Sequence, residues 1–473
     1  MKQATISRKA APEKDAYLAA IAELQAEDQG RSPAWLARIR NSAAERFQRV
    51  GFPTTHDEDW KYTNVAPIVR TQFETALEPP ARAPSADEVD RLAACGAGAA
   101  RLVFVDGHYL ADLSLVPAGL RPVVSLARAI VDRADEVEAH LARYVSPSES
   151  AFAALNTALI QDGAFVFIPR GVIVDEPIEL LFLSSSMERP TASHPRALIV
   201  LETGSAATVV ETYASLGGEP HFTNAVVEIV LGEGASLTHR RILEESERTF
   251  HIGTIEVHES RDSVYTSLNV AAGPELARNG LNVRLTGPGA SCSLNGLTVS
   301  RSSQHVDNHT LIDHATPHGT SRQLYKGVLD DTSRTVFNGK ILVRPGAQAT
   351  DAQQSNRNLL LSSQATLDTK PQLEILADDV RCTHGATVGQ LDEDMVFYLK
   401  SRGLGDDASR AILTYAFASE VVESVGEVSV RSHVERLIAR ALSTSLPNGH
   451  ALTLTLSQRE RGQVGVAEPW TDQ

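Results

Sequence analysis

The chain has 473 residues, 42% of them hydrophobic and 22% charged, an ordinary globular composition that excludes a wholly disordered chain. Its 44 Lys and Arg residues against 59 Asp and Glu residues give a net charge of −15, which argues against a general nucleic-acid binder. No run of about 18 apolar residues occurs, so we expect no membrane-spanning helix.

The N-terminal residues and the cysteines indicate in which cellular compartment the protein resides. Residues 1–15 carry positive charge but no apolar segment behind it, unlike a secretory signal. The three cysteines, Cys95, Cys292 and Cys382, lie far apart, and their odd number does not suggest a disulfide framework. We therefore expect a cytoplasmic protein.

The first third of the chain is predicted to be mostly helical. Apolar residues recur at three- and four-residue steps over residues 14–49, with a break at Gly30 and Pro33. A polar stretch around Trp60 follows, then a short strand at 102–105 and helical patterns at 124–145 and 149–161. We expect residues 1–162 to form an N-terminal, mostly helical region.

From about residue 164 to residue 385 the pattern changes to short runs of Val, Ile, Thr and Leu bounded by turn residues, which predicts strands. A similar turn element recurs at intervals of 30, 55 and 57 residues, and weaker copies lie near the midpoints of the long intervals. The four clear copies begin at Gly204, Gly234, Gly289 and Gly346, and the weaker ones are Asp262-Ser263 and Gly319-Thr320. Such a period indicates a solenoid, so we predict a β-helix core over 163–388. A β-sandwich or jelly roll is the alternative.

Helical patterns return at 394–401, 408–425 and about 428–446, which predicts a C-terminal helical segment over 389–446 and a flexible tail over 447–473. These helices carry more apolar residues than the end of a solenoid can cover, so we expect a partner to dock on them. The predicted partner-binding residues are Phe417, Val421, Leu437 and Ile438. The alternative is that these four residues pack the helices on one another.

The sharpest chemical feature is Cys382 with His384. If the strand that begins at Leu373 continues without a bulge, both side chains point outward on one face. A thiol and an imidazole at this spacing provide two ligands for a soft metal, or an activated thiol. A chance pair at the end of a strand is the alternative.

Two further groups invite chemical interpretations. Four histidines lie within 14 residues and suit zinc or non-haem iron, but a strand would divide them between its two faces. They are His305, His309, His314 and His318. The pairs Asp330-Asp331 and Asp378-Asp379 suggest a carbohydrate-active β-helix enzyme, but adjacent strand residues point to opposite faces. No phosphate-binding G-x-x-x-x-G-K-[ST] motif occurs, so we expect no nucleotide hydrolysis by this chain itself.

Several long motifs occur in order and resemble the SufD members of the SufB/SufD family, which assembles iron–sulfur clusters in the SUF system. The motifs are 325–329 (YKGVL), 336–341 (VFNGKI), 356–362 (NRNLLLS), 369–375 (TKPQLEI), 377–387 (ADDVRCTHGAT) and 397–403 (FYLKSRG), with 59–63 (DWKYT) as a weaker match.

The resemblance implies a mainly β protein, with a right-handed parallel β-helix flanked by N-terminal and C-terminal helical segments. It implies a non-catalytic scaffold subunit that forms a heterodimer with the homologous SufB within a larger complex and binds the ATPase SufC through the C-terminal helices. Cys382 and His384 would be cluster-related ligands shared with a partner chain. The iron–sulfur cluster would be transient in the complex and absent from the isolated chain, and the subunit would also take part in iron handling.

The resemblance leaves alternatives. A SufB-type scaffold subunit is the nearest, and a carbohydrate-active β-helix enzyme is more distant. A homodimer is the alternative assembly in the absence of SufB. The number of cysteines supports a site shared between two chains, because an all-cysteine cluster needs four thiolates and this chain has three widely spaced cysteines.

Overall fold

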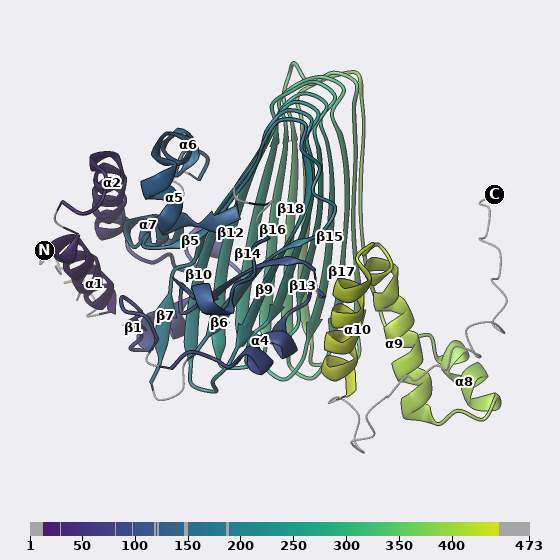
Figure 1. Ribbon diagram of the computed structural model, residues 1–473. Coiled ribbons are helices and arrows are strands. Elements are labelled where there is room, and N and C mark those ends of the chain that lie inside the picture. The colour runs from purple at the N-terminus through teal and green to yellow at the C-terminus, as the bar shows by residue number, and fades with distance from the viewer. Residues whose placement is uncertain are drawn as a thin grey trace, which may run out of the picture.

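The computed structural model describes residues 13–443, except residues 29, 81, 97, 118–119, 121–122, 146–149 and 186–188. Its centre is a parallel β-solenoid with helices contributed by both ends of the chain (Figure 1), which confirms the predicted mainly β fold. The predicted flexible tail, residues 447–473, lies outside the described residues.

The N-terminal part contains helices at the predicted ranges 14–49, 124–145 and 149–161 and a strand that includes the predicted 102–105, together with short helices and strands that were not predicted. The helices are α1 (Glu13–Glu27), α2 (Ala34–Val50), α3 (Ala66–Arg70), α4 (Ala86–Leu92), α5 (Leu126–Asp132), α6 (Ala134–His140) and α7 (Ala151–Ala158). The strands are β1 (Glu74–Thr75), β2 (Ala100–Val105), β3 (His108–Tyr109) and β4 (Val123–Ser125). All four strands join the sheets of the solenoid, so this region is continuous with the core and not a separate layer.

The solenoid strands alternate between two sheets along most of the chain. One sheet holds β5 (Gly163–Ile168), β7 (Thr191–Ser193), β8 (Arg196–Leu201), β10 (His221–Leu231), β12 (Thr249–Glu259), β14 (Leu276–Leu285), β16 (His305–His314), β18 (Arg334–Val343) and β20 (Thr366–Ile375). The other holds β6 (Ile178–Ser184), β9 (Ala206–Ser215), β11 (Ser236–Glu244), β13 (Val264–Ala271), β15 (Ser291–Ser300), β17 (Thr320–Leu329), β19 (Thr350–Leu360) and β21 (Val380–Gly389).

The predicted turn repeat marks the entry to the strands of the second sheet. Gly204, Gly234 and Gly289 have φ angles of 69°, 64° and 73° just before β9, β11 and β15. Of the weaker copies, Asp262 has a φ of 55° before β13, but before β17 the left-handed residue is His318 (φ 62°), one position ahead of the predicted Gly319. Before β19 the left-handed residue is Ala349 (φ 57°) and not the predicted Gly346. Glycine adopts this left-handed conformation without a steric penalty, which explains its recurrence in the sequence.

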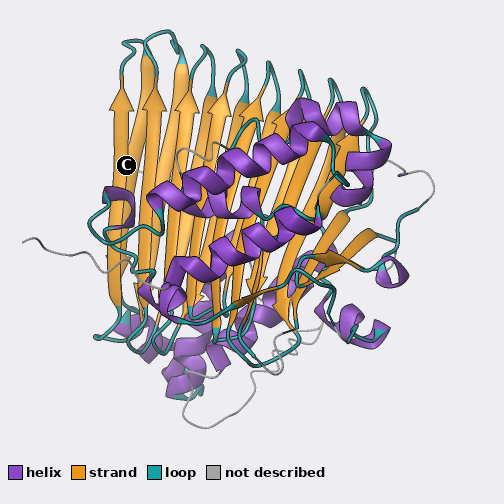
Figure 2. Cartoon of the chain, turned by 90° about the vertical axis from the view of Figure 1, so that its left-hand side faces the viewer, coloured by secondary structure: helices purple, strands orange, loops and turns teal. Residues whose placement is uncertain are grey.

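The strands stack in register, so each side chain lies above the equivalent side chain of the previous turn. Alternate residues point into the lumen, where they form the largest apolar cluster of the described residues. The other residues point outward, and helices cover part of both outer faces. Figure 2 shows long helices lying across the strands on the side of the N-terminal helices.

The C-terminal helices are α8 (Glu393–Ser401), α9 (Asp406–Val422) and α10 (Val428–Ser443). α9 and α10 pack on the outer face of the second sheet, where Val434 and Ile438 join a buried cluster with Val299 of β15 and Val328 of β17. Among the described residues, no helix is long and apolar enough to cross a membrane.

The two ends of the solenoid differ. At the N-terminal end, β3 and β4 add antiparallel strands that close the first turn. At the C-terminal end, β20 pairs only with β18 and β21 only with β19 within the described chain. Each of these last strands therefore presents an edge of backbone groups available for a further strand.

Candidate functional site at the open end of the solenoid

Cys382 and His384 both lie on β21, the last strand of the solenoid. The pairing of β21 with β19 places Cys382 beside Ala352 and His384 beside Gln354. Ala352 and Gln354 are buried in the lumen, and Cys382 packs against the lumen cluster. The two candidate ligands therefore point toward the lumen, at its open end.

The predicted outward orientation of these two side chains is wrong. The prediction assumed one continuous strand from Leu373, but β20 ends at Ile375 and a turn at 376–379 precedes β21. The turn moves the chain into the other sheet, so the alternation of side chains starts again at Val380. The two side chains remain accessible because no further turn of the described residues covers them: Cys382 is partly buried and His384 is exposed.

The environment of Cys382 keeps its thiol protonated in the isolated chain. Partial burial, helped by the negative charge of Asp351, raises the pKa of Cys382. A thiolate is the form that binds metals, so deprotonation of Cys382 requires a cation or metal to arrive. This chain offers one thiol and one imidazole here, and the described residues contain no group of three or more metal-ligating side chains. An iron–sulfur cluster held by four protein ligands would need the rest from another chain.

The other two cysteines are buried. Cys292 points into the lumen in the same column as Cys382, three strands away, a separation of roughly 14 Å that excludes a shared metal ion. Cys95 packs in the cluster beneath the C-terminal helices. Burial raises the pKa of both thiols, and both act as packing residues in the structure.

The four clustered histidines are not brought together. His305 and His309 lie on the outer face of β16, as the strand alternation predicts, whereas His314 points into the lumen and donates to or accepts from Ser321 at 2.9 Å. His318 occupies a turn with a φ of 62°. The hypothesis of a metalloenzyme built on these histidines gains no support from this arrangement.

The 59–63 motif anchors the N-terminal region to the same outer face. The guanidinium of Arg278 lies 3.9 Å from the centre of the Trp60 ring and forms an ion pair with Asp307. Thr63 donates a hydrogen bond to Asp307, which is completely buried. Burial alone would raise the pKa of Asp307. The positive charge of Arg278 and the hydrogen bonds of His309 and Thr63 instead hold the pKa of this carboxyl group far below its ordinary value.

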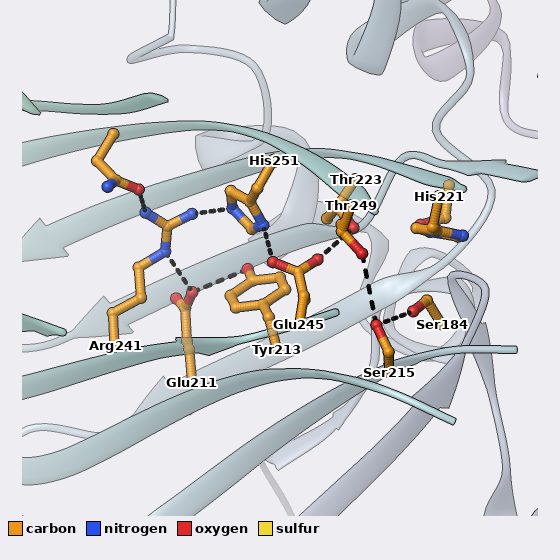
Figure 3. Close-up of polar contacts among 12 residues, drawn as sticks. Ser184, Glu211, Tyr213, Ser215, His221, Thr223, Arg241, Glu245, Thr249 and His251 are labelled. Carbon is orange, nitrogen blue, oxygen red and sulfur yellow. Dashed lines mark hydrogen bonds and ion pairs between the residues drawn. The ribbon is translucent and has the colours of Figure 1, made fainter. Parts of the chain in front are cut away.

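A group of charged side chains that no motif revealed lies deep in the lumen, toward the capped end (Figure 3). Arg241 forms an ion pair with Glu211 at 3.7 Å and donates to Nε2 of His251. The Nδ1 of His251 then donates to Glu245 at 2.7 Å, and Thr223 donates to the same carboxylate at 2.7 Å. Burial lowers the pKa of His251, which agrees with this neutral tautomer. We call this set the lumen charge cluster.

The four predicted partner-binding residues are placed mostly inside the protein. Val421, Leu437 and Ile438 are 1%, 4% and 0% exposed and pack in the cluster between the helices and the sheet. Phe417 is partly buried, with the ammonium of Lys326 4.5 Å from its ring centre. Their burial favours the packing alternative. Most of the exposed large apolar side chains of this segment are instead on α8, where Met395, Phe397 and Tyr398 are 56%, 71% and 56% exposed, and Val428 at the start of α10 is 68% exposed.

The fold and the site together define a β-solenoid that carries a thiol and an imidazole side by side at an open end. Two family models match the chain: "SufBD protein N-terminal region" over residues 12–180 and "SUF system FeS cluster assembly, SufBD core domain" over residues 182–417.

Curated relatives agree with these matches. An iron–sulfur cluster assembly SufBD family protein of Synechocystis is 34% identical over 90% of this chain and 95% of its own length. The iron–sulfur cluster assembly protein SufD of Escherichia coli is 32% identical over 84% of this chain and 91% of its own length. SufD of Bacillus subtilis is 28% identical over 86% and 94%, respectively. The chain belongs to the SufBD family of the SUF system, whose members take part in iron–sulfur cluster assembly.

Proposed function

We propose that this chain is a SufD-type subunit that joins a SufB-type subunit through the open end of the solenoid and contributes Cys382 and His384 to a shared cluster-assembly site. The subunit acts as a non-catalytic, cytoplasmic scaffold in a complex driven by the ATPase SufC, and the nascent cluster and its iron are cargo. The observation that carries this proposal is the position of the two ligands on the last, uncovered strand of the solenoid.

The edge strands supply the means of association. β21 is largely exposed and β20 is mostly half-buried, whereas earlier strands of the solenoid are mostly buried. Apolar side chains accompany the free edges, with Ile375, Leu376 and Val388 exposed by 40%, 54% and 53%. Addition of strands from a homologous solenoid would pair the edge backbone and cover these side chains. A heterodimer and a homodimer would both pair the backbone groups of the edge strands, but only a partner with further ligands completes the site.

Single substitutions test the shared site. We expect Cys382→Ala and His384→Ala each to reduce cluster loading of the reconstituted complex by about 10-fold or more, because each removes a ligand. Thr383→Ala is the matched control, since Thr383 lies between them and points to the other face of the strand. Loading would be measured by visible absorption and iron content. Normal loading of both ligand variants would contradict the proposal, and so would equal losses with Cys95→Ala.

A charge on the free edge tests the mode of assembly. Val388→Lys should prevent association with the SufB-type partner, because it places an ammonium group in the apolar part of the edge. The isolated variant should unfold with a free energy within about 0.5 kcal/mol of the wild type, since Val388 is exposed. Association would be followed by size-exclusion chromatography with light scattering. An unchanged complex would show that the partner docks elsewhere.

We place the docking surface for the ATPase on α8. Phe397 is the most exposed large apolar side chain of the C-terminal helices, and Met395 and Tyr398 lie on the same helix. We expect Phe397→Ala to weaken ATPase binding by about 2 kcal/mol, as truncation of an interface anchor does. Val428→Ala is the control, because Val428 is 68% exposed but begins α10. Equal binding of both variants in a titration would contradict this placement.

A further inference from the structure

A chain of side-chain amides lies in the lumen directly beneath the candidate ligands. Gln354 of β19 donates from Nε2 to Oε1 of Gln323 at 2.7 Å, and Gln323 donates from its own Nε2 to Oγ1 of Thr310 at 2.7 Å. Gln354 and Gln323 are 3% and 4% exposed. Buried amides are costly without partners, so this chain of bonds fixes how both amide groups are oriented.

The last amide of the chain has an unused acceptor. Oε1 of Gln354 is buried and has no hydrogen-bond partner among the described residues. A buried acceptor without a partner costs about 1–3 kcal/mol, so such atoms call for an explanation. The amide cannot easily turn to relieve the cost, because its Nε2 is committed to Gln323.

The lumen is shaped to admit this amide. Gly339 of β18 lies opposite, and a Cβ atom there would be 2.4 Å from Nε2 of Gln354. Any other residue at position 339 would push the amide aside. The sequence therefore leaves room for Gln354 to extend across the lumen, one strand below the open end.

The residue in register above Gln354 is His384. Neighbouring strands are about 4.8 Å apart, so the two side chains, which share the lumen face, lie within reach of one another. His384 is exposed and is not covered by any residue that the structure describes. An imidazole that binds a metal through one nitrogen usually donates its other N–H to an oxygen, which fixes the tautomer and the orientation of the ring.

We propose that Gln354 is a positioning residue for His384: its Oε1 accepts a hydrogen bond from one imidazole N–H, so that the other ring nitrogen presents its lone pair at the open end. The amide chain through Gln323 to Thr310 holds Gln354 in place for this purpose. This inference rests on the proposed function for the ligand role of His384, but the hydrogen bond itself is a property of this chain alone.

Three variants separate positioning from packing. Gln354→Leu removes both the acceptor toward His384 and the donor to Gln323. Gln354→Glu also lacks the donor to Gln323 but keeps an acceptor toward His384. Gln353→Leu is the control, because Gln353 is the exposed neighbour that points to the outer face. Unfolding curves would show that all three fold. If Gln354 only fills the lumen, the two Gln354 variants should behave alike.

The direct measurement is the tautomer of His384 in the full chain. Histidines labelled with ¹⁵N would be observed at about pH 8.5, where imidazoles are neutral, and the His384 signal would be assigned by its absence from His384→Gln. We expect one dominant tautomer in the wild type, Gln354→Glu and Gln353→Leu, and a mixture in Gln354→Leu. In the reconstituted complex, Gln354→Leu should also reduce cluster loading by about 10-fold or more, with recovery in Gln354→Glu.

The outcomes distinguish this inference from the proposed function. An unchanged tautomer in Gln354→Leu would overturn the inference even if Cys382→Ala and His384→Ala abolish loading. Normal loading of the two ligand variants would instead overturn the shared cluster site, while a tautomer change in Gln354→Leu would still establish the hydrogen bond.

Discussion

The two halves of the solenoid lumen have opposite character. Toward the capped N-terminal end the lumen holds charged groups that are completely buried and bonded to one another, such as Arg241 with Glu211. Toward the C-terminal end it holds neutral amides and then opens onto an exposed imidazole and a half-buried thiol. The comparison indicates that the polar groups of the first half are bonded to one another inside the protein, whereas the second half ends in two side chains, Cys382 and His384, that a partner can reach.

The largest expected effect comes from breaking the lumen charge cluster. Arg241→Met would remove the guanidinium from the buried carboxylate of Glu211, which would keep only its contacts with Tyr213 and His239, and we expect a loss of about 3–5 kcal/mol of the free energy of unfolding. The control is Lys340→Met, because Lys340 pairs with Glu374 on the exposed outer face and should cost less than about 1 kcal/mol. Urea unfolding of the full chain would measure both. Equal losses of unfolding free energy in the two variants would show that the buried lumen charges contribute no more to stability than an exposed ion pair does.

A smaller, pH-dependent effect is expected from His314, which lies in the lumen between the two halves. Burial lowers the pKa of His314 to about 4. In the unfolded chain a histidine has a pKa of about 6.5, so as the pH falls from about 6.5 toward 4 the unfolded state takes up a proton that the folded state does not. The free energy of unfolding is therefore highest above about pH 6.5, and His314 lowers it by up to about 3 kcal/mol as the pH falls toward 4.

The variant His314→Gln should lose part of this pH dependence. Its free energy of unfolding should fall less steeply than that of the wild type between about pH 6.5 and pH 4, because glutamine does not titrate. His309→Gln, on the outer face, is the comparison variant. Parallel pH curves for the wild type and His314→Gln would show that this histidine does not contribute to the acid sensitivity.

The smallest effect tests the outer face, where the N-terminal region is anchored. Asp307→Asn should cost about 2 kcal/mol, because the hydrogen bonds to Arg278 and Thr63 lose their charge. Asp368→Asn is a matched control, since Asp368 lies in the same column at the exposed last turn and pairs with Arg334. Faster tryptic cleavage near Lys61 in Asp307→Asn alone would show release of the anchor, and equal cleavage of both variants would contradict it.

The sequence allowed much of the fold to be predicted because the fold repeats. A turn with a left-handed residue recurs at the entries to β9, β11, β13, β15, β17 and β19 of one sheet, and the weaker copy at Asp262 has the same backbone conformation as Gly234. The longer helices followed from apolar spacing, whereas the short helices α3 and α4 were not predicted.

The sequence motif singled out Cys382 and His384, whose role as ligands stays a prediction, but the predicted orientation of their side chains was wrong. The side on which they lie depends on a turn at 376–379 that the apolar pattern does not mark. The lumen charge cluster was missed because its members come from separate strands and form no motif. A signal was present, since Glu211 and Arg241 are charged residues at inward positions of otherwise apolar strands.

The in-register stacking has a consequence for local stability along the axis of the solenoid. Each turn is held by the turn before and the turn after it, as in other repeat proteins, but the last turn has a neighbour on one side only. Amide hydrogens of β21 and β20 should therefore exchange with solvent far sooner than those of β12 or β10, where opening requires disruption of turns on both sides. The end that carries Cys382 and His384 can thus rearrange against another protein while the interior turns stay closed.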